Sequence, residues 1–146
     1  DPKRTMYYPQ DPVFRDSAME VFLSFDDGRS YLNLEINANG AMLAQYGPGR
    51  ADRRPFSNEE RRLVEVQAEC LADRWSIMLR ISRELLESLF DTAPGPGAHF
   101  TFNCYKISED PDIEHYASLF LVHSETPDFH RPQDFGPAII TKEDVQ

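Results

Sequence analysis

Two neighbouring stretches of the chain alternate strictly between two sets of side chains, and this period of two predicts β-strands. In residues 17–25 one face carries Met19, Val21, Leu23 and Phe25, and the other carries Glu20, Phe22 and Ser24. In residues 31–37 the apolar set Leu32, Leu34 and Ile36 lies opposite Tyr31, Asn33, Glu35 and Asn37. The intervening Asp26-Asp27-Gly28 is typical of a hairpin turn, so we expect the two strands to pair.

Similar short runs separated by turn signals continue along the chain. Strands are predicted over residues 41–46, 63–70, 75–81, 100–105 and 138–141, and residues 116–122 form a mixed run. The charged residues 47–61 are expected to form a loop. Residues 83–90 have apolar side chains at helical spacing and predict one short helix. This pattern predicts an all-β fold, an antiparallel β-sandwich of immunoglobulin-like or jelly-roll type with one short helix.

The length and charge of the chain narrow the choice of partners. We expect its 146 residues to form a single domain, residues 1–146, large enough to bury a core. A formal charge of −10 leaves no basic stripe, which disfavours nucleic acid and anionic membrane surfaces as partners. No apolar run approaches the length of a membrane span. The localisation stays open, because no signal peptide is visible and the sequence begins at Asp1.

Neither metal nor cofactor chemistry is indicated by any motif. Cys70 and Cys104 lie far apart and in phase with apolar neighbours, so we expect buried free thiols rather than a disulfide. Asp26-Asp27-Gly28 lacks the ligand spacing of a calcium loop, and no His or Cys cluster has zinc spacing. A nucleophile elbow, a phosphate loop and a cofactor fingerprint are also missing from the sequence, so no cofactor and no metal are expected.

Five motifs follow one another in a recognisable order. They are Pro12-Val-Phe-Arg-Asp-Ser-Ala-Met-Glu20, Tyr31-Leu-Asn-Leu-Glu35, Trp75-Ser-Ile-Met-Leu-Arg-Ile81 with Leu85-Leu-Glu-Ser-Leu89, Asn103-Cys-Tyr-Lys106, and Pro127-Asp-Phe-His-Arg-Pro-Gln-Asp-Phe-Gly136. Together they cover most of the chain, and their order resembles carbohydrate-binding modules of family 9 and their family 9-like relatives. The resemblance implies a β-sandwich that binds a saccharide and does not act as an enzyme.

The same resemblance implies roles for individual residues. Phe14 takes the first of two positions whose aromatic rings clamp a sugar; the second is expected within residues 118–123, where Phe120 is the nearest aromatic and no tryptophan occurs. The positions expected to hydrogen-bond the ligand are Glu20, Asn33 and Glu35, followed by Asn103 and Tyr105. In the closing motif the residues expected to build a structural turn are Phe129, His130, Phe135 and Gly136.

Other interpretations remain open. Full modules of the family carry further strands before the Asp-Ser-x-x-Glu strand, and three alternatives follow: the chain is an N-terminally truncated module, the missing strands are disordered, or another chain supplies them at an open sheet edge. An interaction module that kept the fold but lost the sugar clamp is therefore the main alternative. A glycoside hydrolase using Glu20 and Glu35 is the third. The polar strand face could also be a solvated sheet surface, and Arg50-Ala-Asp-Arg-Arg-Pro55 a solvated loop.

Overall fold

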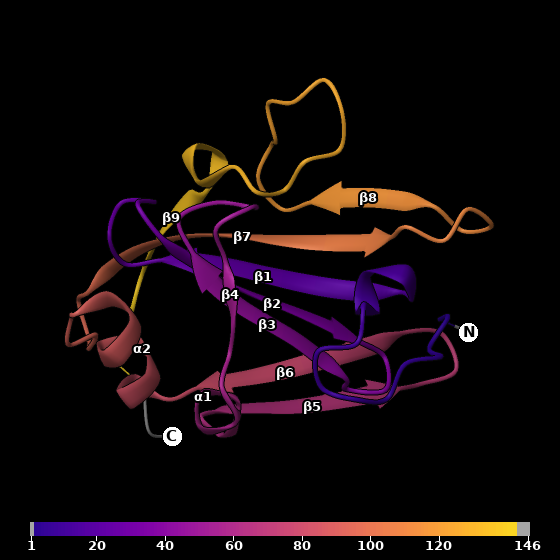
Figure 1. Cartoon of the computed structure of the whole chain (residues 1–146), viewed down its shortest axis with the longest axis horizontal. Helices are drawn as coiled ribbons and strands as arrows, with labels where there is room; N and C mark the ends of the chain where they lie inside the picture. Colours follow the sequence, from indigo (N-terminus) through magenta and orange to yellow (C-terminus); the bar gives the residue numbers. More distant parts are fainter. Residues whose placement is uncertain (1, 143–146) are drawn as a thin grey trace.

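Two antiparallel β-sheets lie one above the other in the computed structural model, which describes residues 2–142 (Figure 1). The larger sheet has the strand order β4-β3-β2-β1-β7-β8, and β8 and β9 pair with the two ends of β7. Its strands are β1 (Ala18–Ser24), β2 (Tyr31–Asn37), β3 (Met42–Gly47), β4 (Arg54–Pro55), β7 (His99–Ser108), β8 (His115–Ser118) and β9 (Gly136–Ile139). The smaller sheet contains β5 (Val64–Cys70) and β6 (Trp75–Ile81). The predicted antiparallel, all-β sandwich is confirmed.

The predicted hairpin joins the two central strands of the larger sheet. β1 and β2 pair antiparallel from Ala18 opposite Asn37 to Leu23 opposite Leu32. In the turn between them Asp27 and Gly28 have positive φ angles of 59° and 79°. Glycine and aspartate tolerate this region better than most residues, which explains why this short acidic sequence can reverse the chain.

The main hydrophobic core fills the space between the two sheets. It is built from the apolar sets that alternate along β1 and β2, together with inward-facing residues of β5 and β6. Among its buried members are Leu23, Leu32, Leu34, Ile36 and Val64, and the half-buried Ile77 and Leu79 pack against them. Burying one such side chain stabilises the fold by roughly 1.5–3 kcal/mol. The alternation in the sequence therefore identified the core face correctly.

The predicted helix over residues 83–90 is α2 (Arg83–Phe90), and it covers one end of this core. It begins after Ser82, whose hydroxyl accepts a hydrogen bond from the Leu85 backbone nitrogen at 3.2 Å. Its four apolar residues, Leu85, Leu86, Leu89 and Phe90, are all buried. The helix forms because its apolar stripe can be buried against both sheets.

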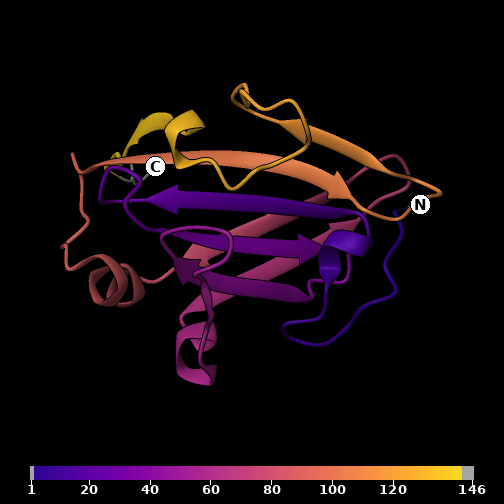
Figure 2. The ribbon, with the colours of Figure 1, turned by 45° about the horizontal axis from the view of Figure 1, so that its top comes forward.

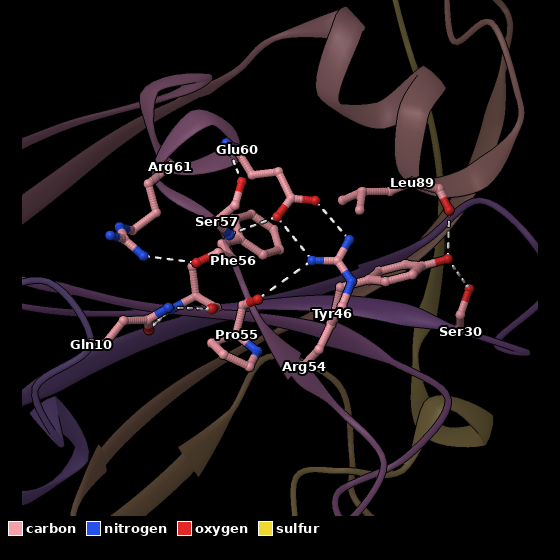
Figure 3. A network of polar contacts seen from close by, with 11 residues as sticks. Gln10, Ser30, Tyr46, Arg54, Pro55, Phe56, Ser57, Glu60, Arg61 and Leu89 are labelled. Carbon is pink, nitrogen blue, oxygen red and sulfur yellow. Dashed lines mark hydrogen bonds and ion pairs between the residues drawn. The ribbon is translucent and has the colours of Figure 1, made fainter.

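The prediction of a loop over residues 47–61 is wrong at its end, where β4 and a second helix, α1 (Asn58–Arg62), are present. A capping box starts α1: Ser57 accepts from the Glu60 backbone, and Glu60 accepts from the Ser57 backbone. Glu60 also receives two hydrogen bonds from Arg54, at 2.7 and 2.9 Å (Figure 3). The contacts between Arg54 and Glu60 in Figure 3 join β4 to α1, and they anchor the far end of the β3–β4 loop.

The outer face of the larger sheet is buried as well. The short 3₁₀ helices η1 (Val13–Arg15) and η2 (Pro132–Asp134) and the segment between β8 and η2 lie on this side (Figure 2). A second apolar cluster forms there, with Val13, Phe22, Tyr31, Tyr105, Phe129 and Phe135. The interpretation of this face as a solvated sheet surface is therefore wrong, because even Asn33 and Asn37 have no exposed surface.

Both cysteines are free thiols, as predicted, although each is only half-buried. Within residues 2–142 no helix is long and apolar enough to cross a membrane. The same residues contain no group of three or more His, Cys, Asp or Glu side chains placed to hold a metal ion.

Candidate functional site

A cavity of about 330 Å³ opens on the outer face of the larger sheet. Its floor comes from β1, β2 and β3, and its walls come from η1, the β3–β4 loop, the end of β7, β8 and the segment before η2. The residues that line it are Phe14, Glu20, Glu35, Leu43, Gln45, Arg50, Arg53, Ile107, Glu109, Tyr116, Pro127, Phe129 and His130. Three residues that the sequence singled out for ligand contact, Phe14, Glu20 and Glu35, thus meet in one place.

The two glutamates of the floor form a directly opposed pair. Glu20 on β1 is the antiparallel partner of Glu35 on β2, and each is only 5% exposed. Opposed residues on one face of a sheet place their Cβ atoms about 4.5–5.5 Å apart, so the two carboxyl groups share the same small space. This arrangement follows from the hairpin register alone.

An amide joins this pair to a wall of the cavity. Asn33 donates a hydrogen bond from Nδ2 to Glu35 Oε1 at 2.8 Å. Its Oδ1 accepts a hydrogen bond of 2.7 Å from Nη1 of Arg53, which belongs to the β3–β4 loop. Asn33 therefore lies behind the cavity surface, where it orients both a carboxyl group and a guanidinium group.

Burial dominates the electrostatics of the floor. It raises the pKa of Glu35 to about 7, against the attraction of the Arg53 charge. Burial, followed by the charge of Glu35, raises the pKa of Glu20 well above its ordinary value. Burial also lowers the pKa of Arg53, which is partly enclosed beside the pair. At neutral pH the floor thus favours retaining a proton.

Aromatic side chains form much of the wall. Phe14 comes from η1, whereas Tyr116 comes from β8, which pairs with β7 on the side away from β1. The Tyr116 ring lies 6.1 Å from the Phe129 ring in an edge-to-face arrangement. Aromatic faces beside polar groups are typical of sites that bind polar ligands with an apolar ring surface.

The closing motif holds this wall in place. Tyr31 and His130 share a hydrogen bond of 2.9 Å between Oη and Nδ1. Burial lowers the pKa of His130 to about 3, so its imidazole is neutral. Phe129 stacks on Tyr105 with 4.0 Å between the ring centroids, and Phe135 packs edge-to-face on Tyr31.

The other three residues predicted to contact the ligand lie away from the cavity surface. Tyr105 is buried, and its hydroxyl donates to the Phe129 carbonyl at 3.1 Å. Asn103 is buried too; its side chain accepts from the Phe120 backbone nitrogen at 3.0 Å and donates to the Phe120 carbonyl at 3.1 Å. The Phe120 ring packs edge-to-face on Phe102 and over Gly136, outside the cavity. These residues support the segment that follows β8.

Several lining residues were missed by sequence reasoning. Gln45 and Leu43 share the outward phase of β3, a signal that the alternation of residues 41–46 already contained. Arg53 lies in the charged segment interpreted as a solvated loop, and no local signal indicates that this loop folds over the sheet. Arg50, at the start of the same segment, was considered as a ligand contact, although a surface role was favoured. Tyr116 lies just before the stretch searched for a second aromatic residue.

The comparisons with known proteins agree with the motifs. The sequence profile described as carbohydrate-binding family 9 matches residues 4–140. The search of curated proteins found no match to this sequence.

Among solved structures, a Bacteroides uniformis protein proposed to bind carbohydrate has a TM-score of 0.80 and 23% identity, with 93% of this chain and 66% of that chain covered. A family 9 carbohydrate-binding module from Caldicellulosiruptor kristjanssonii also matches. Its complex with glucose has a TM-score of 0.59 and 13% identity, covering 97% of this chain and 66% of that one. Its complex with cellotriose has a TM-score of 0.58 and 13% identity, covering 95% and 65%. This chain thus spans about two thirds of each matched structure. Because the family profile matches residues 4–140, the chain belongs to carbohydrate-binding family 9.

Proposed function

We propose that this chain binds a saccharide in the cavity above β1, β2 and β3 and releases it unchanged. The observation that carries the proposal is the meeting of Phe14 and Tyr116 with the buried Glu20–Glu35 pair in one cavity of about 330 Å³. A sugar has apolar ring faces for aromatic stacking and hydroxyl groups for carboxyl and guanidinium partners. The glucose and cellotriose complexes of the Caldicellulosiruptor module support this class of ligand.

In this proposal each side chain has one task. Phe14 and Tyr116 contact the faces of the sugar ring, with Tyr116 in place of the residue that the sequence suggested within 118–123. Glu20, Glu35 and Arg53 bind hydroxyl groups, and Asn33 holds Glu35 and Arg53 in position. Asn103, Tyr105 and Phe120 act indirectly, because they support the segment that carries Phe129 and His130.

The paired carboxyl groups fit binding better than glycoside hydrolysis. A retaining enzyme needs one carboxylate that stays ionised as nucleophile and one protonated acid, so the environments of the two must drive their pKa values apart. Here burial raises the pKa of both Glu20 and Glu35. Because burial acts on both side chains in the same direction, neither glutamate is set apart as the ionised nucleophile.

The proposal is tested by titration calorimetry with glucose, cellotriose and a panel of other neutral and acidic saccharides. The parent chain is compared with Phe14→Ala and Tyr116→Ala, and with Tyr8→Ala as a matched control, because Tyr8 is 74% exposed and lies outside this cavity. A shallow site that stacks one or two rings should bind with a Kd on the order of micromolar to millimolar.

We expect each cavity variant to weaken binding about tenfold or more, while Tyr8→Ala binds like the parent. The proposal is overturned if a folded parent chain binds none of these saccharides. It also fails if Phe14→Ala and Tyr116→Ala both bind as the parent does.

A further inference from the structure

We propose that Glu20 and Glu35 share a single proton at neutral pH. In this state the cavity recognises an uncharged sugar through one carboxyl and one carboxylate group, and its affinity for that sugar falls when the proton is removed. This inference rests on the proposed function and specifies the ligand class and the pH control of the same site. Its basis is the hydrogen bonding of the pair and the charges around it.

The pair lacks the partners that would keep both carboxylates ionised. Glu35 uses Oε1 to accept from Asn33, while its buried Oε2 has no hydrogen-bond partner within residues 2–142. In the same residues no ion pair or hydrogen bond to another side chain reaches the carboxyl group of Glu20. Two carboxylates placed this close in a buried site repel each other strongly, and retaining one proton removes that repulsion.

The nearest cation is already engaged. Arg53 donates from Nη1 to the amide oxygen of Asn33 and forms no ion pair with either glutamate. The Arg53 charge therefore acts on the two glutamates from a distance, without a direct hydrogen bond to either of them. Oε2 of Glu35 stays without a hydrogen-bond donor. A ligand hydroxyl group that reaches this oxygen would supply the missing hydrogen bond.

Charged and titratable groups face the pair from every surrounding element. The β3–β4 loop contributes Arg50 and Arg53, the residue after β7 is Glu109, and the segment before η2 contributes the neutral His130 and, near Tyr31, Asp128. Within the sheet the titratable neighbours are Tyr31 on β2 and two residues of β7, Tyr105 and Lys106. The Lys106 side chain points to the opposite face of the sheet. These neighbours and the burial of both side chains set the protonation of the pair.

With one proton on the pair, the charges that line the cavity balance. The pair and Glu109 then carry two negative charges, and Arg50 and Arg53 carry two positive charges. A cavity in this state gives no net attraction to a uronate or to a protonated amino sugar. It offers neighbouring sugar hydroxyl groups one proton donor and one strong acceptor, which suits an uncharged saccharide.

Raising the pH removes the shared proton and with it the donor. The pKa of Glu35, about 7, places this change in an accessible range, and the pair is expected to titrate in two coupled steps. Above the second step two carboxylates face the ligand, so affinity for an uncharged sugar falls. Below the first step both groups are neutral and the strong acceptor is lost, so the affinity profile has a maximum between the two steps.

The test measures affinity for glucose and cellotriose from pH 5 to pH 9.5, in pairs of buffers with different ionisation enthalpies. The variant Glu35→Gln keeps an acceptor for Asn33 and provides a permanent amide donor beside Glu20. Glu87→Gln is the matched control, because Glu87 is exposed on α2, away from the cavity. A second readout needs no ligand: carboxyl ¹³C NMR follows the titration of Glu20 and Glu35 in the free chain.

We expect the affinity of the parent and of Glu87→Gln to change at least threefold across this range, with buffer-dependent heats that report proton exchange. Glu35→Gln should bind without the decline at high pH. A sugar that binds with a flat profile, or carboxyl signals that both titrate below pH 6, would overturn the shared proton and leave the proposed function intact. Absence of sugar binding at every pH, from a chain whose carboxyl groups titrate as expected, would instead overturn the proposed function.

Discussion

Asn37 donates a hydrogen bond from Nδ2 to Oδ2 of Asp16, and the two atoms lie 2.8 Å apart with no exposure of either residue. The same carboxylate accepts hydrogen bonds from the backbone nitrogens of Thr5 and Met6 and from the Thr5 hydroxyl. Asp16 therefore fastens the N-terminal segment to the end of β2, two residues after Phe14. The first residue of the Asp-Ser-x-x-Glu motif thus fixes the N-terminal segment that carries Phe14.

The variant Asp16→Asn should destabilise the fold by about 2–3 kcal/mol, because an amide has one acceptor oxygen and cannot accept all four of these hydrogen bonds. Urea denaturation at pH 7 measures the change, with Asp112→Asn as an exposed aspartate control. These hydrogen bonds lower the pKa of Asp16 despite its burial, so its contribution to stability is present above pH 4 and is lost as the pH falls through the folded-state pKa. A variant as stable as the control would show that this anchor is dispensable.

His130 should make the fold sensitive to acid. Its pKa is about 3 in the folded chain, whereas an unfolded histidine takes up a proton near pH 6.5. Between these values the unfolded state binds more protons, so the stability contributed by the neutral imidazole decreases as the pH falls below about 6.5. We expect His130→Gln to remove roughly 1–3 kcal/mol of the difference in unfolding free energy between pH 7 and pH 4.

Denaturation curves at the two pH values check this expectation. Tyr31→Phe is the companion variant, since it removes the hydroxyl bonded to Nδ1 and keeps the histidine. It should lose stability at both pH values and retain the acid sensitivity. If His130→Gln and the parent lose the same free energy on acidification, another group causes the effect.

Glu35 should act on stability with the opposite sign. Its pKa is raised from 4.5 to about 7 in the folded chain, so between these values the folded state holds the extra proton. Stability is therefore lost as the pH rises from 4.5 to 7, and above pH 7 the full cost of the buried charge remains. We expect Glu35→Gln to be more stable than the parent at pH 8 by roughly 1–3 kcal/mol, and to lose this advantage at pH 4. Thermal unfolding of both proteins at the two pH values measures it, and an equal advantage at both would contradict the role of ionisation.

The sequence predicted well those features that depend on neighbours along the chain. Alternation along β1 and β2 identified both faces of the hairpin, and the apolar spacing of residues 83–90 gave the bounds of α2. Strand phase also placed Glu20 and Glu35 on the same face of the hairpin, and the family motif pointed to Phe14. Each of these features is encoded within a single helix, hairpin or motif.

Features that depend on how loops fold over the sheet could not be predicted in this way. Arg53 reaches Asn33 only because the β3–β4 loop returns over the outer face, and β4 and α1 hold the far end of that loop. Tyr116 and Phe120 lie four residues apart, yet the pairing of β8 with β7 places only the first of them in the cavity. The capping box at Ser57 and Glu60 was a readable signal for α1, but no apolar stripe accompanied it.

The contact between Phe120 and Gly136 provides a test of where this aromatic residue acts. A Cβ atom on Gly136 would overlap the ring of Phe120, far inside van der Waals contact. The variant Gly136→Ala should therefore destabilise the fold by about 2–3 kcal/mol, since either the ring or β9 must move. Gly49→Ala is the matched control, because no atom outside its chain neighbours lies within 4 Å of its added Cβ. Phe120→Leu in the same chain should recover part of the loss, and denaturation of the single and double variants measures this coupling. Strictly additive losses would show that the Phe120 ring does not press on β9.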